Sequence, residues 1–101
     1  MAVEFSRAAE DDLFEILLYG IERYGLVQAE RYKGQLDKIF QTLSDNPSIT
    51  RLREDITPGV RVYPAQKHMI VYTILGDGKT VFVLRVRHQR ENWLEHPVTE
   101  P

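Results

Sequence analysis

The residues best suited to chemistry are concentrated near the end of the sequence. Guanidinium groups stay charged and form paired hydrogen bonds with phosphates or carboxylates, and an indole offers a large flat anchor for a partner. The basic and aromatic run from Arg85 to Trp93 is therefore typical of contact with RNA phosphates or of a protein-binding patch. In a third interpretation, the arginines are solvated or paired with Glu91 and Glu95 while the indole packs on the core. The residues concerned are Arg85, Arg87, His88, Arg90 and Trp93.

Other motifs that carry chemistry are missing from the sequence. His68, His88 and His96 stand without a metalloprotease motif or paired carboxylates, so we expect no metal site. His68 and His88 can approach across neighbouring strands, where His88 would form hydrogen bonds or serve as half of an acid–base pair. Gly76–Gly78 lacks the spacing of a phosphate-binding loop and predicts a hairpin turn. No serine lies in a nucleophile-elbow motif, and we expect no cofactor.

The composition indicates one small globular domain. The chain has 101 residues, of which 43% are hydrophobic and 28% charged, close to the average for soluble domains. We expect one domain over residues 1–101, with 96–101 as a flexible tail. There is no cysteine, which excludes disulfides and thiolate zinc sites. The sequence begins without a signal-peptide pattern, and no apolar run approaches the roughly 18 residues of a membrane span, so a cytoplasmic location is expected.

Charge is distributed unevenly along the chain. The formal net charge is -2, but residues 1–47 are net acidic and residues 48–101 are net basic. A bipolar surface of this kind can attract different partners to different faces. Two ordinary solvated faces would produce the same pattern.

The first half of the chain predicts a short strand and two helices that position these residues. Val3–Phe5 is the expected strand, and Ser6 is placed to cap the first helix. Gly25 would end that helix, because glycine readily adopts a positive φ. Asn46–Pro47 would end the second, and the short connection predicts an antiparallel helical hairpin. Apolar residues recur every three to four positions: Leu13, Ile16, Leu17, Gly20, Ile21 and Tyr24, then Ala29, Tyr32, Leu36, Ile39, Phe40 and Leu43.

The second half predicts an antiparallel sheet. After a turn at Thr57–Gly59, strands are expected at Val60–Tyr63, His68–Leu75 and Thr80–Arg87, and a short helix at Gln89–Glu95. The fold class is then α+β, in the order β-α-α-β-β-β, with the helical hairpin on one face of a small antiparallel sheet. Alternation in the last strand predicts that Phe82, Leu84 and Val86 lie on one face of the sheet. The opposite face would carry Val81, Val83, Arg85 and Arg87.

The order and spacing of several stretches resemble a known family. The most specific are Pro58–Tyr63, Lys67–Tyr72 and Val83–Arg90, and the likeness runs from Phe5 to Trp93. The chain resembles the ParE branch of the RelE/ParE toxin superfamily, the toxic half of bacterial type II toxin–antitoxin pairs. The resemblance implies a toxin that is not an enzyme, binds DNA gyrase and blocks replication.

The resemblance also implies two binding surfaces. A cognate ParD-like antitoxin, of the ribbon-helix-helix class, would lay an amphipathic C-terminal segment into an apolar groove along the helical hairpin. Packing against the chain's own sheet is the alternative for most groove residues. The groove residues expected are Leu13, Leu17, Tyr24, Tyr32 and Leu36. The residues expected to contact gyrase are Arg61, Lys67, Arg85, Arg87, His88, Arg90 and Trp93.

Two other functions stay open at this point. RelE-like relatives are ribosome-dependent mRNA endonucleases, often with a late tyrosine, whereas here Trp93 stands in that region and no tyrosine follows Tyr72. In such an enzyme His88 would be the general acid or base, and three arginines would stabilise charge on the phosphate: Arg61, Arg85 and Arg87. The near-neutral total charge favours gyrase over a ribosome. The remaining alternative is an inert module that binds the antitoxin without being toxic.

Overall fold

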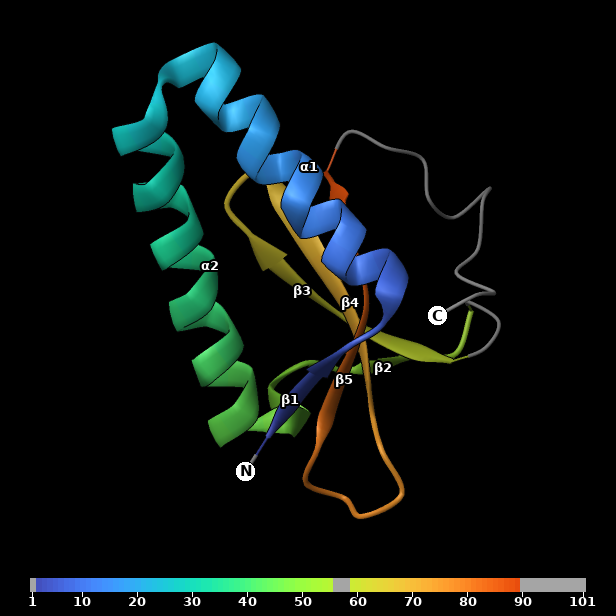
Figure 1. Ribbon diagram of the computed structural model, residues 1–101. Helices are drawn as coiled ribbons and strands as arrows, with labels where there is room; N and C mark the ends of the chain where they lie inside the picture. The colour runs from blue at the N-terminus through green and yellow to red at the C-terminus, as the bar shows by residue number, and fades with distance from the viewer. Residues whose placement is uncertain (1, 56–58, 90–101) are drawn as a thin grey trace.

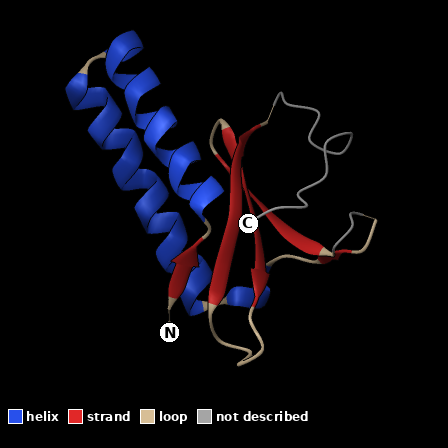
Figure 2. Ribbon diagram, turned by 45° about the vertical axis from the view of Figure 1, so that its right-hand side comes forward, coloured by secondary structure: helices blue, strands red, loops and turns tan. Residues whose placement is uncertain are grey.

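The helical hairpin and the sheet form two layers, with both helices on one face of the sheet (Figures 1 and 2). The structure is a computed structural model and describes residues 2–55 and 59–89. The predicted α+β class is confirmed. Within the described residues, neither long helix is apolar enough along its length to cross a membrane. The elements are β1 (Val3–Phe5), α1 (Arg7–Tyr24), α2 (Leu26–Asp45), the 3-10 helix η1 (Pro47–Ile49), β2 (Leu52–Arg53), β3 (Val60–Ala65), β4 (His68–Ile74) and β5 (Val81–His88).

Local sequence signals set the ends of the two helices. Ser6 Oγ accepts a hydrogen bond from the Ala9 N–H at 3.0 Å and caps α1. Gly25, with a φ of 92°, is the single residue between α1 and α2. Gly20 lets the helices approach closely, because a Cβ at that position would lie 3.2 Å from the Cβ of Ala29. The predicted helical hairpin and its ends at Gly25 and Asn46 are confirmed.

The sheet is mixed, so the prediction of a purely antiparallel sheet is wrong. Its strand order is β1-β5-β4-β3-β2, and β1 pairs in parallel with β5, while the other pairs are antiparallel. An alternating apolar pattern is the same for a parallel and an antiparallel strand, so it could not predict the direction of β1 relative to β5. Ser6 fixes that edge: its N–H donates to the Val83 carbonyl at 2.9 Å, and its hydroxyl to the Leu84 carbonyl at 2.7 Å.

An irregularity in β5 overturns the predicted faces of the last strand. Tyr72 pairs with Val83 while Val71 pairs with Arg85, which leaves Leu84 as an extra residue. A bulge of this kind shifts the alternation by one position. The helix-covered face therefore carries Val81, Val83 and Val86, whereas Leu84 packs on the opposite face with Val60, Val62, Met69 and Val71.

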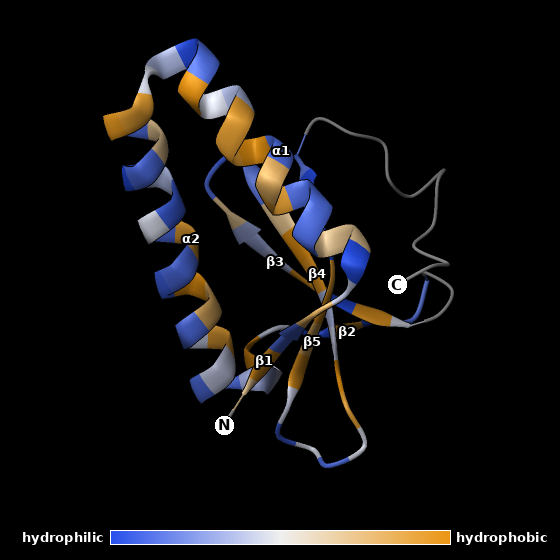
Figure 3. Ribbon diagram, in the orientation of Figure 1, coloured by the Kyte–Doolittle hydropathy of each residue, from blue (hydrophilic) through white to orange (hydrophobic). Residues whose placement is uncertain are grey.

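The main core lies between the hairpin and the sheet. Phe5 and Phe40 meet there edge to face, with ring centroids 5.0 Å apart, and Leu36, Leu43 and Tyr72 are buried beside them. Figure 3 shows apolar positions recurring along both helices and β4, while the loop between β4 and β5 is hydrophilic. Burial of these side chains holds the two layers together.

The predicted hairpin turn at Gly76–Gly78 is confirmed. The Asp77 carboxylate accepts hydrogen bonds from the backbone N–H groups of Lys79 and Thr80, both at 2.8 Å. It also accepts one from the Thr80 hydroxyl at 2.6 Å. These bonds lower the pKa of Asp77 to about 2, with the Thr80 hydroxyl as the largest cause.

Several predictions lie outside the described residues. They are most of the turn at Thr57–Gly59, the terminal helix beyond Gln89, the tail 96–101, and the proposed contacts of Arg90 and Trp93. Gln89 itself forms a turn after β5.

Candidate functional site

A groove of about 1640 Å³ separates the helical hairpin from the ends of β4 and β5 and from the β3–β4 turn. Leu13, Ile16 and Leu17 of α1 line it, as does Tyr32 of α2. It continues to the hairpin tip, where Tyr24 is 54% exposed. Monomeric proteins seldom leave contiguous apolar and aromatic side chains uncovered, so the groove has the character of a surface for a partner.

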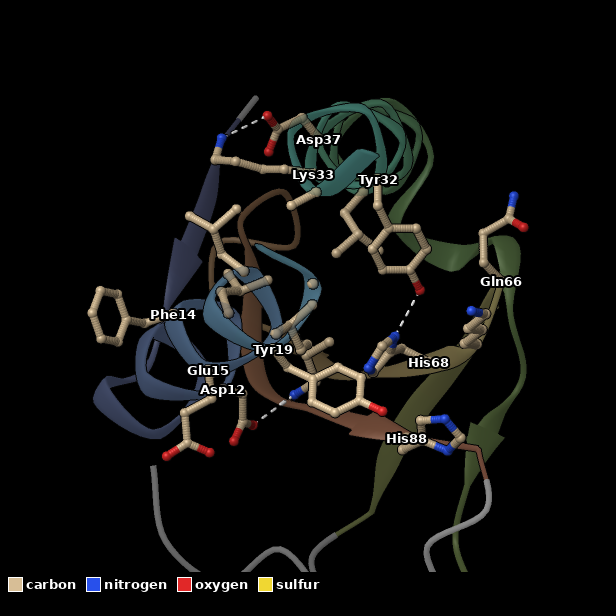
Figure 4. A pocket seen from close by; sticks show the side chains of 18 of the residues that line it. Asp12, Phe14, Glu15, Tyr19, Tyr32, Lys33, Asp37, Gln66, His68 and His88 are labelled. Carbon is tan, nitrogen blue, oxygen red and sulfur yellow. Dashed lines mark hydrogen bonds and ion pairs between the residues drawn. The ribbon is translucent and has the colours of Figure 1, made fainter. Parts of the chain in front are cut away.

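One end of this groove is formed by a tyrosine and two histidines. The Tyr32 hydroxyl lies 2.6 Å from Nδ1 of His68 and 3.4 Å from the Ala65 carbonyl (Figure 4). His68 and His88 are directly paired across β4 and β5, with ring centroids 5.3 Å apart and planes at 75°. Burial raises the pKa of Tyr32. The predicted approach of His68 and His88 is confirmed.

The β3–β4 turn closes the same end and is held in an unusual conformation. Gln66 has a φ of 59°, a region that residues other than glycine seldom adopt. Gln89 holds the turn: its N–H donates to the Lys67 carbonyl at 2.9 Å, and its Nε2 donates to the Gln66 carbonyl at 2.6 Å. The turn directs the Lys67 ammonium over the Tyr24 ring, 4.9 Å from its centroid.

An ion pair joins α1 to the bulged part of β5. Nε and Nη2 of Arg85 each donate to the Asp12 carboxylate at 2.8 Å, and the Val86 N–H donates to the same carboxylate at 2.9 Å. The side chains of Arg85 and Asp12 are only 28% and 14% exposed. Asp12 therefore ties the helix to the strand through charge-assisted hydrogen bonds.

The residues predicted for the antitoxin groove divide into two sets. Leu17, Tyr24 and Tyr32 line the groove with part or most of their surface exposed. Leu13 is half-buried and packs against the main core, and Leu36 is only 2% exposed within that core. Both also border the groove, so the structure brings all five residues to one surface, with Leu36 at its floor.

The described residues predicted for gyrase contact do not form one patch. Arg61 lies on the helix-covered face, paired with Tyr72, and its guanidinium donates to the Thr50 carbonyl. Arg87 pairs with Met69 and shares the opposite face with it. Lys67 and His88 lie at the groove, and Arg85 is paired with Asp12. The basic residues of β3 and β5 are therefore divided between the two faces of the sheet.

Sequence reasoning missed Phe14 and Tyr19, which border the groove and are 62% and 59% exposed. The signal was present, because both aromatic residues fall off the predicted core stripe of α1. Gln66 and Gln89 were also missed, since their roles depend on a turn conformation that composition does not reveal. Among the described residues, no group of three or more histidine, cysteine, aspartate or glutamate side chains could hold a metal ion.

Comparison with known proteins identifies the family. Residues 3–93 match the sequence profile described as "ParE toxin of type II toxin-antitoxin system, parDE". The chain belongs to the ParE toxin family of type II toxin–antitoxin systems. It is 39% identical to Toxin ParE1 of Mycobacterium tuberculosis over 85 residues, which cover 84% of this chain and 86% of the relative. It is 30% identical to Toxin ParE1 of Caulobacter vibrioides over 91 residues, covering 90% and 92%.

Solved structures support the same fold. A chain of the chromosomal ParDE toxin–antitoxin system of P. aeruginosa superposes with a TM-score of 0.74 at 20% identity, covering 87% of this chain and 95% of that one. A mutant of the E. coli toxin RelE in the free state gives a TM-score of 0.62 at 17% identity, covering 95% and 90%. The resemblance to the ParE branch of the superfamily is thus confirmed, and the family implies a ParD antitoxin as partner.

Proposed function

We propose that this ParE-family toxin inhibits DNA gyrase and so blocks replication in the cytoplasm. The observation that carries the proposal is the family match over residues 3–93, which includes the basic and aromatic run that begins within β5 and extends in the sequence to Trp93. Arg87, His88, Arg90 and Trp93 are the proposed principal contacts, because this run combines fixed positive charge with a large aromatic anchor. Arg61, Lys67 and Arg85 have a supporting part, since each already contacts Thr50, Tyr24 or Asp12.

The second half of the proposal concerns neutralisation. A ParD antitoxin of the ribbon-helix-helix class lays an amphipathic C-terminal segment into the groove, along Leu13, Leu17, Tyr24, Tyr32 and Leu36. The exposed aromatic side chains at the rim and the apolar floor support this assignment, because an amphipathic helix binds through apolar anchors in such a groove. Binding to the folded toxin would also raise its stability by mass action.

The gyrase proposal is tested with purified toxin, gyrase and relaxed plasmid. We expect wild-type toxin to inhibit supercoiling and to trap cleaved plasmid, and Trp93→Ala to weaken both effects at least tenfold. Lys79→Gln is the matched control, because Lys79 lies in the exposed β4–β5 loop away from the groove. Absence of inhibition by folded, antitoxin-free toxin would contradict the proposal.

Two further assays separate the alternatives. Purified ribosomes programmed with mRNA would show cuts at codon positions if the toxin were a RelE-like endonuclease, and His88→Ala would abolish them. Induction of the toxin alone in bacteria tests for an inert module. Normal growth at good soluble expression would favour that module over either toxin.

A further inference from the structure

The groove is electrically polar along its length. Its α1 side begins with Asp12, whose charge is paired with Arg85, and with Glu15, whereas the paired histidines lie at the end closed by the β3–β4 turn (Figure 4). Arg23 and Lys67 also line the groove and add positive charge to that end. On α2, Lys33 and Asp37 pair with each other at 2.9 Å and add no net charge to either end. A partner that fits this groove must therefore match a change of sign as well as an apolar floor.

The basic end is also preorganised. The turn that carries Lys67 and leads into His68 keeps its positive-φ Gln66 because Gln89, the residue after β5, binds it. Tyr32 fixes the orientation of the His68 ring through Nδ1, and His88 packs edge-on against that ring. Groups held in place before binding lose less conformational entropy when a partner arrives.

We propose that this basic end of the groove, formed by Lys67, His68 and His88, binds a carboxylate of the antitoxin's docking segment. The inference rests on the proposed function, because it assigns the partner's chemistry at the proposed antitoxin groove. The carboxylate belongs either to an aspartate or glutamate side chain or to the segment's C-terminus. Both have the same recognition chemistry, charge-assisted hydrogen bonds from imidazolium and ammonium groups.

The proposal fixes the direction of the pH dependence. Two imidazolium rings at this separation repel each other, and a carboxylate between or beside them offsets the repulsion. A carboxylate that accepts hydrogen bonds from protonated rings favours their protonated state, so binding takes up protons and affinity rises as the pH falls.

Within residues 2–55 and 59–89, the titratable groups that line the groove with the histidines belong to α1, α2 and the β3–β4 turn. Those of α1 are Glu15, Tyr19, Arg23 and Tyr24, with Asp12 at the far end of the groove. Those of α2 are Tyr32 and the Lys33–Asp37 pair, and the turn adds Lys67. The histidine double variant described below isolates the two rings from these groups.

The experiment measures the affinity of the full-length toxin for the antitoxin encoded beside its gene, by calorimetry at low salt. We expect wild-type affinity to rise roughly tenfold between pH 7.5 and pH 5.5. The double variant His68→Gln/His88→Gln should lose this rise. Lys67→Gln should weaken binding roughly fivefold, whereas Lys79→Gln should leave it unchanged.

Two antitoxin arms identify the source of the carboxylate. In one, each acidic residue of the antitoxin's C-terminal segment is changed to its amide. In the other, a synthetic C-terminal segment is compared as free acid and as C-terminal amide. If one of these changes to the antitoxin abolishes both the pH dependence of binding and the loss of affinity caused by Lys67→Gln, the carboxylate that it altered is the one that binds the basic end. If neither does so, the inference is overturned.

Failure of the inference is distinguishable from failure of the proposed groove. The double variant Leu17→Ala/Tyr19→Ala tests the groove itself, and unchanged antitoxin affinity would reject the groove as the binding surface. If that variant weakens binding while Lys67→Gln has no effect and affinity is constant or falls on acidification, the groove stands and the carboxylate site is rejected. Circular dichroism of each variant confirms that it is folded.

Discussion

The two ends of the helical hairpin place similar side chains in opposite environments. Near the end of α2, Phe40 and Leu43 are 6% and 0% exposed, covered by β1 and the sheet. At the tip, where the hairpin projects beyond the sheet in Figure 1, Leu26 and Val27 are 57% and 69% exposed. Apolar side chains of the hairpin therefore form a core where the sheet covers them, and an open surface where the sheet ends.

The largest expected effect is a difference in stability between substitutions at the covered end of the hairpin and in the groove. Leu43→Ala removes a fully buried side chain and should lower the free energy of unfolding by roughly 2–5 kcal/mol, because it leaves a cavity in the core. Leu17→Ala, the same change in the groove, should lower it by less than half as much. Urea unfolding followed by circular dichroism measures both. Equal losses would mean that the groove is as much a part of the core as the closed end.

A second prediction concerns the boundary between the two ends, where Asp12 ties α1 to β5. Asp12→Ala deprives the partly buried Arg85 guanidinium and the Val86 N–H of this acceptor, and should reduce stability by roughly 1–3 kcal/mol. Asp37→Ala is the control, since it breaks only the exposed pair with Lys33 and should change stability by less than about 0.5 kcal/mol. If the two variants unfold at the same urea concentration, Asp12 does not anchor the helix.

A third, smaller effect is expected at the open end, where Tyr32 contacts His68. Tyr32→Phe keeps the ring but removes the hydroxyl, so stability should fall by roughly 0.5–1.5 kcal/mol. Tyr19→Phe removes an exposed hydroxyl and is the control. Thermal unfolding measures the loss, and the NMR signals of the His68 ring should shift in the Tyr32 variant alone. Unaltered ring signals would show that the hydroxyl does not position the imidazole.

The smallest expected effect on stability is in the β4–β5 loop, away from both ends of the helical hairpin. The folded-state pKa of Asp77, about 2, is below its ordinary value of 3.8, so its ionised form stabilises the native state. Compared with Asp77→Asn, the wild type should have an advantage that is fully present above pH 3.8 and is lost as the pH falls through about 2. Urea unfolding of both proteins between pH 2 and 6 measures it. A difference in stability independent of pH would contradict the assignment.

The sequence predicted what depends on local rules. The cap at Ser6, the connection at Gly25, the end of α2 at Asn46–Pro47 and the turn at Gly76–Gly78 each follow from the conformational preference of a few neighbouring residues. The apolar stripes predicted the helical hairpin, and the approach of His68 and His88 followed from the strand assignments. The order of several motifs was enough to indicate the ParE family.

The tertiary structure alone decided how these elements combine. The direction of β1 and the Asp12–Arg85 pair depend on contacts between segments more than 70 residues apart in the chain. The bulge at Leu84 depends on how β5 pairs with β4. Because the bulge changes which side chains share a face, it also placed Arg87 on the face opposite Arg61. An apolar stripe marks a face of a helix, but only the extent of the neighbouring sheet determines which part of that face is covered.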